Sequence, residues 1–129
     1  MSTSFSKIIS GEIPCHKIAE NDRFLAFLDI LPLAKGHTLI IPKQPVDYFF
    51  DLDNDLLAEY NVFAKEIARK IKAVVPCIKI GVAVIGLEVP HAHMHLVPMN
   101  HIGDLNFTKE RVKLTPEEFS ALAEQIRNA

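Results

Sequence analysis

A chain of 129 residues is long enough for one compact domain and too short for two ordinary ones. Its 49% hydrophobic and 23% charged residues are typical of a folded domain and exclude a disordered tail. The net charge of −2 provides no bulk basic field to attract nucleic acid or an anionic membrane, so we expect neither as a partner.

The cysteines and the N-terminal segment give no sign of a secreted protein. Cys15 and Cys77 do not form a metal-binding spacing, and nothing in the sequence supports an oxidising compartment. Residues 1–14 lack the apolar core of a signal peptide, and no later run approaches the ~20 apolar residues that span a bilayer. We expect a cytoplasmic protein whose residues 1–129 form a single domain.

The first forty residues are predicted to form short strands separated by turns. HKIA (16–19) precedes a polar turn at 20–22, and FLAFLDI (24–30) is apolar enough for a buried strand. A loop at 31–36 contains proline and glycine. The β-branched segment HTLIIP (37–42) follows as a further strand.

A long helix is predicted over residues 54–75. Apolar residues recur there at steps of three and four, as on one face of a helix: Leu56, Tyr60, Phe63, Ile67, Ile71 and Val74. The acidic segment DLDND (51–55) could be a metal-binding cluster, but helix capping already accounts for its residues. Pro76 ends the pattern.

Two more strands and a second helix complete the pattern. IKIGVAVI (78–85) is an apolar strand, and the segment 91–97 alternates as a strand does. Residues 115–118, TPEE, combine an N-cap, a proline at the first helical position and a capping-box Glu, so a short C-terminal helix begins there. Because the helices do not alternate with the strands, we predict an α+β fold with a mainly antiparallel sheet of about five strands.

Residues 91–97, HAHMHLV, carry a histidine at every second position. In a strand, His91, His93 and His95 would point to one face, and the residues between them to the other. A His-x-His pair can bind one zinc ion at ~2.0–2.1 Å. All three cannot easily do so, because the backbones of His91 and His95 lie ~13 Å apart at ~3.3 Å per residue. The sequence shows no clear source of further ligands, so we expect no metal.

Two other interpretations of the three histidines remain. One is a polar strand face that carries histidines by chance. The other is catalysis, since neutral imidazole is a nucleophile at pH 7 and imidazolium stabilises anionic oxygens or protonates a leaving group. That combination suits transfer at phosphorus, where positioning and charge stabilisation do most of the work.

The segment 91–97 matches the signature of the histidine triad (HIT) superfamily, His-φ-His-φ-His-φ-φ, where φ is apolar. PLAKGHTLIIPK (32–43) resembles the segment of that family with a fourth histidine, here His37. IISGEIPCHKIAENDRFLAFLDI (8–30) resembles its opening strands. The resemblance implies an α+β homodimer that acts as a nucleotide hydrolase or transferase at the α-phosphorus, with a small nucleotide substrate and no cofactor.

The same resemblance implies roles for the four histidines. His93 would be the nucleophile and become transiently nucleotidylated. The backbone carbonyl of His91 would hold the ring of His93 in the useful tautomer, while His95 and His37 would line the phosphate. His16 and His101 are expected to be surface or packing residues.

The resemblance also implies a set of nucleotide-binding residues. Asp29 matches the acidic residue that accepts hydrogen bonds from the ribose hydroxyls. The others expected to bind the nucleotide are Ile30, Gly86, Leu87, Glu88, Val89, His93 and His95. Ile18, Phe27 and Leu28 fall near positions that enclose the base, although core packing accounts for these three equally well.

The chain departs from the family pattern just before the triad. Relatives usually carry Gly-Gln-Ser/Thr-Val where this chain has Gly86-Leu87-Glu88-Val89, and an Asn of the preceding strand aligns with Ile80. A carboxylate beside a phosphate is unfavourable unless Glu88 turns away, is protonated or pairs with a cation. Our hypothesis is that Glu88 favours a cationic leaving group, or that turnover is slow.

Many bacterial relatives hold a structural zinc with an N-terminal Cys-x-x-Cys. Residues 3–6, TSFS, stand in its place here, so we expect no zinc. We predict cleavage of a phosphoramidate or mixed phosphoanhydride of a purine nucleotide. The alternatives are a dinucleoside polyphosphate hydrolase of the same superfamily, a nucleotide-binding module with weak turnover and, more remotely, a metalloenzyme.

Overall fold

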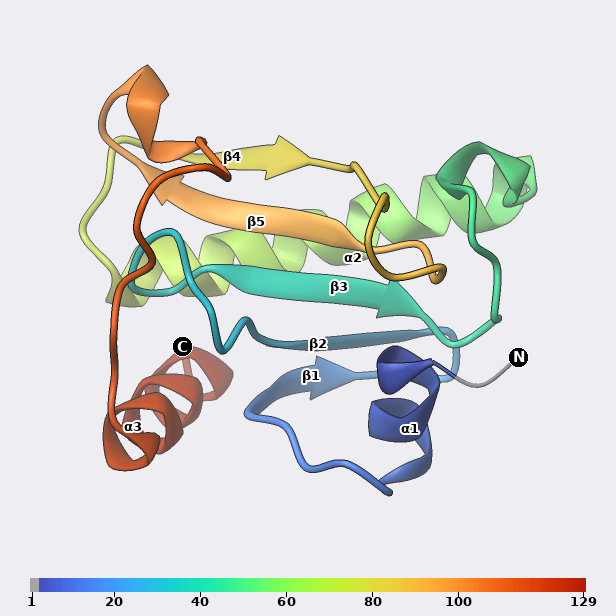
Figure 1. Cartoon of the computed structure of the whole chain (residues 1–129), viewed down its shortest axis with the longest axis horizontal. Helices are drawn as coiled ribbons and strands as arrows, with labels where there is room; N and C mark the ends of the chain where they lie inside the picture. Colours follow the sequence, from blue (N-terminus) through green and yellow to red (C-terminus); the bar gives the residue numbers. More distant parts are fainter. Residues whose placement is uncertain (1–2) are drawn as a thin grey trace.

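The computed structural model describes residues 3–129, which form five strands and three α-helices (Figure 1). The strands are β1 (Lys17–Glu20), β2 (Phe24–Leu28), β3 (Thr38–Pro42), β4 (Lys79–Ala83) and β5 (Met94–Met99). The helices are α1 (Ser4–Ser10), α2 (Asn54–Val74) and α3 (Pro116–Arg127), with 3-10 turns at Phe49–Asp51 and Ile102–Asp104. The predicted α+β class, the long helix and the short C-terminal helix are confirmed.

The strands form one antiparallel sheet in the order β1-β2-β3-β5-β4. Phe27 of β2 lies opposite Leu39 of β3, and Leu39 lies opposite His95 of β5. Residues that face each other across an antiparallel sheet share one of its faces. Phe27, Leu39 and His95 therefore form a row across the sheet.

Helices cover both faces of the sheet. In Figure 1, α2 runs behind the sheet and α1 lies in front of β1 and β2. The main core packs α2 and α3 against one face, for example Ile67 and Ile126 against Ile40. A smaller core packs Phe5 of α1 against the other face. Because β2 and β3 are covered on both sides, all their residues are buried, which explains their continuous apolar sequence.

Helix capping accounts for the acidic residues before α2. The side chain of Asp53 accepts a hydrogen bond from the amide of Leu56, 2.8 Å away, and so caps one of the free amides at the helix start. The C-terminal helix begins as predicted, since Thr115 and Glu118 form a capping box. No helix within residues 3–129 is both long and apolar enough to cross a bilayer.

The structure differs from the sequence expectations in two places. Residues Ser4–Ser10 form a helix where only strands and turns were expected in the first forty residues. Strand β5 begins at Met94, so His91 and His93 precede it and do not follow a regular strand alternation. At that point the amides of His91 and Ala92 bond instead to the carbonyls of Val89 and Val46.

Candidate functional site

A cleft of about 430 Å³ opens on the face of the sheet that carries α1. All the residues expected to bind a nucleotide line this cleft, namely Asp29, Ile30, Gly86, Leu87, Glu88, Val89, His93 and His95. His91 and His37 are buried and do not line it. The tertiary fold thus brings the end of β2, the segment before the triad and the triad itself together around one opening.

His93 is oriented by the backbone of the triad itself. Its Nδ1 lies 2.8 Å from the carbonyl oxygen of His91, and a carbonyl can only accept a hydrogen bond. In the neutral ring Nδ1 therefore carries the proton, and the lone pair is on Nε2. The edge of Phe5 packs against the ring, with 4.9 Å between centroids. The expected role of the His91 carbonyl has the geometry it requires.

The imidazole of His91 is a structural anchor. Its Nε2 lies 2.8 Å from the carbonyl of Pro42, at the end of β3, and donates to it. The residue is 1% exposed. This bond ties the irregular segment before β5 to the neighbouring strand, and so positions the carbonyl on which His93 depends.

His37 follows a tight turn that only glycine fits. Gly36 has a φ of +95°, and a Cβ there would lie 2.9 Å from Cγ2 of Val75. The amide of Leu33 donates to Nδ1 of His37 across this turn, over 2.9 Å. Nδ1 is thus an acceptor, and the proton of the neutral ring lies on Nε2.

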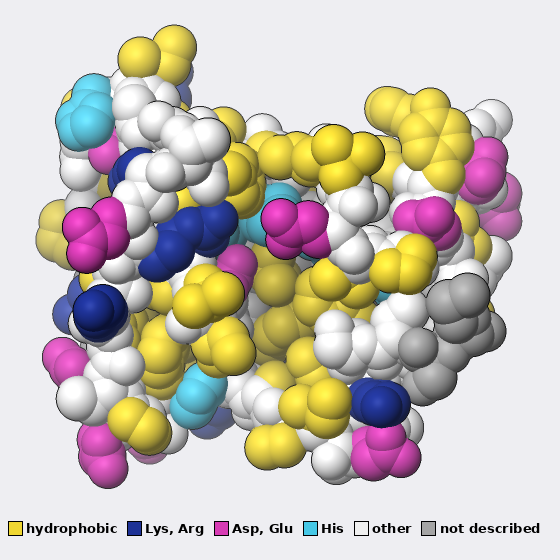
Figure 2. All heavy atoms as spheres, in the orientation of Figure 1, with side chains coloured by type: hydrophobic (Ala, Val, Ile, Leu, Met, Phe, Trp, Pro, Cys, Tyr) yellow, Lys and Arg dark blue, Asp and Glu magenta, His cyan; other side chains and the backbone are white. Residues whose placement is uncertain are grey.

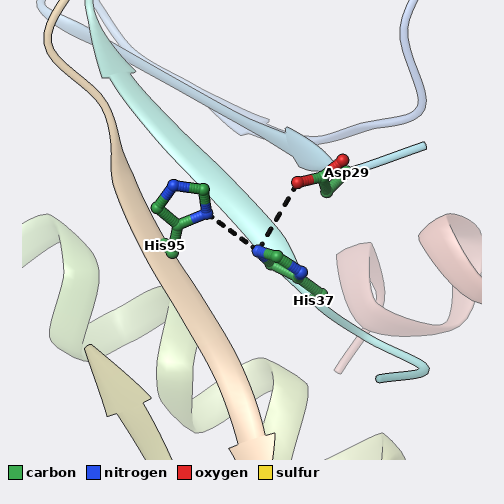
Figure 3. A group of neighbouring side chains, drawn as sticks. All are labelled: Asp29, His37 and His95. Atoms are coloured by element: carbon green, nitrogen blue, oxygen red, sulfur yellow. Dashed lines mark hydrogen bonds and ion pairs between the residues drawn. The ribbon is translucent and has the colours of Figure 1, made fainter. Parts of the chain in front are cut away.

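The proton of His37 determines the tautomer of His95. Nε2 of His37 lies 2.9 Å from Nδ1 of His95 and donates to it, as Figure 3 shows. His95 must then carry its own proton on Nε2. Because His95 lines the cleft while its Nδ1 is occupied by His37, its free N–H is the one available to a bound group.

Both of these histidines are neutral at pH 7. Burial lowers the pKa of His37 to about 3, and the charges of nearby His95, Arg111 and Lys109 add to the effect. Burial likewise lowers the pKa of His95 to about 4, with contributions from His93 and Arg111. A neutral pair is what the hydrogen bond between them requires, since a doubly protonated ring could not accept.

Asp29 stands beside the same pair. One of its oxygens accepts a hydrogen bond from the amide of Leu31 at 2.8 Å, and the other lies 3.5 Å from Nε2 of His37 (Figure 3). Burial raises the pKa of Asp29, while the Leu31 amide and the nearby Arg111 charge oppose that rise. The carboxylate is available at the wall of the cleft.

Asp29, His37 and His95 place three potential metal ligands within 4.8 Å of one another. The fold thus brings two further potential ligands, Asp29 and His37, to the triad, although no spacing in the sequence marked them as such. The two histidine nitrogens are 2.9 Å apart, however, whereas two nitrogens bound to one tetrahedral zinc lie about 3.3 Å apart. The observed spacing is that of a hydrogen bond between the rings.

Residues 3–6, where the sequence analysis expects no zinc, contain no cysteine, histidine or carboxylate to bind a metal. Residues 3–6 form the first turn of α1, where Thr3 and Ser6 cap each other through side chain and backbone. Phe5 points into the smaller core. This stretch serves to start a helix.

The apolar end of the cleft bears on the two interpretations of Ile18, Phe27 and Leu28. Phe27 and Leu28 line it, although Leu28 is 1% exposed and also belongs to the main core. Ile18 is 2% exposed, belongs to that core and does not line the cleft. The apolar lining residues that the sequence analysis missed include Phe5, Ile8 and Ile13. Phe5 and Ile8 have the i, i+3 spacing of a helix, but one such pair is too short to establish a period, and Ile13 lies beyond the end of α1.

Other residues named in the sequence analysis lie at the exposed rim of the cleft, in the core or at the surface. Glu88 and Leu87 are exposed at the rim, and Leu87 is 89% exposed. Ile80 is half-buried and packs against the main core, not in the cleft. His16 stacks on Phe119, and His101 pairs with Asp104 at the surface. The last two thus have the packing and surface places expected of them.

Two further residues of the cleft, from a different segment, were not expected from the sequence. Phe107 and Arg111 come from the segment after β5 and close the cleft beside the triad. The edge of the Phe107 ring lies 4.7 Å from the ring of His95, centroid to centroid. No motif in the sequence marks these two residues, because their approach to the triad depends on the path of the chain after β5.

Known proteins resemble this chain over most of its length. A family model described as "HIT domain" matches residues 10–102. An uncharacterized HIT-like protein of Helicobacter pylori is 44% identical over 96 residues, which cover 72% of this chain and 92% of that protein. An adenosine 5'-monophosphoramidase of Schizosaccharomyces pombe is 35% identical over 131 residues, covering 98% of this chain and 96% of the relative.

Solved structures agree with the sequence relatives. A HIT-like protein of Bartonella henselae superposes with a TM-score of 0.84 at 29% identity, over 98% of this chain and 95% of that one. A zinc-bound histidine triad protein of Mycobacterium smegmatis gives 0.82 at 28% identity, over 99% and 92%. With the triad, its fourth histidine and the fold in agreement, the chain belongs to the histidine triad (HIT) superfamily of nucleotide-binding hydrolases and transferases.

Proposed function

We propose that this protein cleaves a phosphoramidate or mixed phosphoanhydride bond at the α-phosphorus of a purine nucleotide. His93 attacks phosphorus through Nε2, and the bond to the leaving group breaks as that group takes up a proton from water. Water then attacks the nucleotidyl-histidine, which releases the nucleoside monophosphate and regenerates the ring. The observation that carries this proposal is the hydrogen bond from Nδ1 of His93 to the His91 carbonyl, because it leaves Nε2 as the nucleophile.

His95 supports the proposal as a hydrogen-bond donor, whereas His93 acts as the nucleophile. Its tautomer leaves an N–H on Nε2 at the cleft, where it can donate to a phosphoryl oxygen as charge develops. One ring thus offers a lone pair while its neighbour, 5.1 Å away between centroids, offers a hydrogen bond. Asp29 is the residue we assign to the ribose hydroxyls, and Phe5, Ile8 and Ile13 enclose the base.

The phosphoramidate is favoured over a dinucleoside polyphosphate by two observations. The S. pombe relative, named an adenosine 5'-monophosphoramidase, matches nearly the whole chain. Glu88 lies at the rim, where it would repel a polyphosphate leaving group and attract a cationic amine. A dinucleotide remains the second substrate to assay.

We also infer that two copies of the chain pair through the edge of the sheet. Strand β4 is the last strand in the sheet order and has no neighbour on its outer side within residues 3–129 (Figure 1). Ile78 and Val82, beside and within it, are 63% and 56% exposed. An edge strand with exposed apolar side chains is suited to pairing with another chain.

The chemistry is tested by trapping the covalent intermediate. Purified protein is mixed with adenosine 5'-phosphoramidate, quenched in acid-free denaturant and weighed by intact-mass spectrometry. The wild type should gain the mass of one adenylyl group on His93, and His93→Ala should show neither adduct nor turnover while keeping its melting temperature. Turnover by His93→Ala would overturn the proposal.

A further inference from the structure

The cleft is poor in positive charge for a site that is to hold a phosphate. Asp29 and Glu88 are the acidic residues of its lining, and His95, which lines it, is held neutral. Arg111 is the one Lys or Arg among the lining residues that the structure describes. An anionic ligand would meet two carboxylates and this single fixed cation.

Arg111 is held firmly at the cleft wall. One terminal nitrogen, Nη1, donates to the carbonyl of Leu31 over 2.7 Å, and Nη2 donates to the carbonyl of Phe107 over 3.2 Å. The guanidinium carbon lies 5.6 Å from the centre of the Phe107 ring. A guanidinium has five N–H groups, so these two bonds leave three for a ligand.

The segment that carries Arg111 is fastened to the loop after β2. The amide of Val112 donates to the carbonyl of Pro32 over 2.9 Å, next to the bond from Arg111 to Leu31. Arg111 therefore stands beside the loop that begins at Asp29, the residue assigned to the ribose. The charge of Arg111 also opposes the rise in the pKa of Asp29, so the cation lies within electrostatic range of the carboxylate assigned to the ribose.

The position of Arg111 relative to the triad follows from two observations. Phe107, on which the guanidinium rests, places its ring edge against His95. The charge of Arg111 also contributes to lowering the pKa of His95 and of His37, after burial, which places it within electrostatic range of both. Figure 2 shows basic and acidic side chains on either side of a histidine at the hollow of this face.

We propose that Arg111 binds the phosphate of the nucleotide, and supplies the positive charge that the neutral His95 and the two carboxylates of the cleft do not. This inference rests on the proposed function in that it takes the ligand to be a nucleotide. The planar guanidinium donates to non-bridging phosphate oxygens while its other bonds keep it in place. It also offsets the repulsion between Glu88 and the phosphate.

The alternative is that Arg111 only fastens its segment to the loop after β2. The two roles differ in one measurable respect. A phosphate-binding residue changes the affinity for a nucleotide and leaves the affinity for the nucleoside unchanged. A fastening residue changes both alike, since loosening the wall disturbs the whole cleft.

The experiment compares AMP with adenosine by isothermal titration calorimetry at pH 7.5 and low salt. Arg111→Ala should weaken AMP binding roughly 10- to 100-fold, as expected for a lost charge-assisted hydrogen bond, with adenosine affinity unchanged within twofold. Arg111→Lys should lie between Ala and wild type, because it keeps the charge without the planar fork. Arg111→Gln, which can still donate to Leu31, should behave as Ala does.

Arg127→Ala is the matched control. Arg127 also fastens its segment to a backbone carbonyl, with Nη2 donating to Lys17 over 2.6 Å, but it does not line the cleft. Its loss should lower the melting temperature and leave the ratio of AMP to adenosine affinity unchanged. If Arg111→Ala does not fold, the comparison of Lys with Gln separates charge from fastening.

The outcomes also separate this inference from the proposed function. Unchanged AMP affinity in Arg111→Ala, or a parallel loss of AMP and adenosine affinity, overturns the role of Arg111 even if the His93 adduct forms. A wild type that binds AMP through Arg111 but forms no adduct overturns the chemistry and keeps the phosphate site. A wild type that binds neither ligand overturns both.

Discussion

Nε2 of His37 lies 2.9 Å from Nδ1 of His95, although 58 positions separate the two residues in the chain. Since the amide of Leu33 occupies the other nitrogen of His37, the protons of both rings are assigned by a single backbone group. The result is an N–H on His95 that faces the cleft. His37 therefore acts on the site through His95, without lining the cleft itself.

This relationship predicts the effect of replacing His37. His37→Phe removes the donor to His95, so the His95 ring can turn or change tautomer, and we expect kcat to fall roughly 100-fold. His37→Gln places an amide N–H near the position of Nε2 and should retain more than a tenth of the wild-type kcat. Steady-state assays with a phosphoramidate measure both. Equal losses in the two variants would contradict the tautomer argument.

Stability should fall as the pH falls from 6.5 to about 4.5. His37 and His95 have folded pKa values of about 3 and about 4, below the ordinary 6.5 of an unfolded chain, so in this window the unfolded state binds more protons. Each then costs up to about 1.4 kcal/mol of unfolding free energy per pH unit. Asp29, whose pKa is raised by burial, offsets part of this near the lower end.

Urea denaturation across this pH range measures the effect. The slope of unfolding free energy against pH should be smaller in His37→Gln than in the wild type. His101→Gln is the control, because the side chain of His101 is 73% exposed. A slope that His37→Gln leaves unchanged would show that His37 does not titrate differently in the folded and unfolded chains.

Glu88 should select among leaving groups. It is exposed at the rim of the cleft, so its charge is screened and we expect an effect of only a few-fold. The wild type should favour a phosphoramidate with a cationic amine over one with a neutral amine, and Glu88→Gln should reduce that preference. Ratios of kcat/KM at low and high salt give the measurement. Glu124→Gln, on the exposed side of α3, serves as the control. An equal preference for the cationic amine in both variants would contradict this role of Glu88.

If two copies pair through β4, a single substitution on that strand should change the molecular mass of the assembly in solution. Val82→Glu introduces a charge at the exposed edge and should convert a dimer to a monomer in size-exclusion chromatography with light scattering. Ala121→Glu, an equally drastic change on exposed α3, should leave the mass unaltered. A wild type that elutes as a monomer at all concentrations would remove the inference.

The elements that were predicted well are those with strong local patterns. The spacing of Leu56, Tyr60 and Ile67 defines α2, and the cap at Asp53 fixes its start within one residue. Helix α1 was missed because its seven residues are too few to show a period. Its stability comes from burying Phe5 against the sheet, which is a tertiary contact.

The sequence does not predict which apolar residues line the cleft, or that Arg111 lies beside it. Phe27 and Leu28 are adjacent apolar residues of one buried strand, yet Leu28 packs in the main core and Phe27 in the smaller core at the cleft. A shift of one residue in a strand exchanges its two faces, so periodicity alone cannot decide which is which. Arg111 reaches the triad only because the chain after β5 folds back over the loop after β2.

The sequence by itself determined the α+β class, the order of the strands along the chain and the long helix, and it singled out Asp29, His93 and His95, which line the cleft, because these follow from local periodicity and a specific motif. The tertiary structure decided which nitrogen of each histidine carries the proton. That choice depends on the single acceptor or donor that the fold holds at each ring: the carbonyl of Pro42 at His91, the carbonyl of His91 at His93, the amide of Leu33 at His37, and the ring of His37 at His95. A proton's place on an imidazole is a property of the partners around the ring, and those partners meet only when the chain is folded.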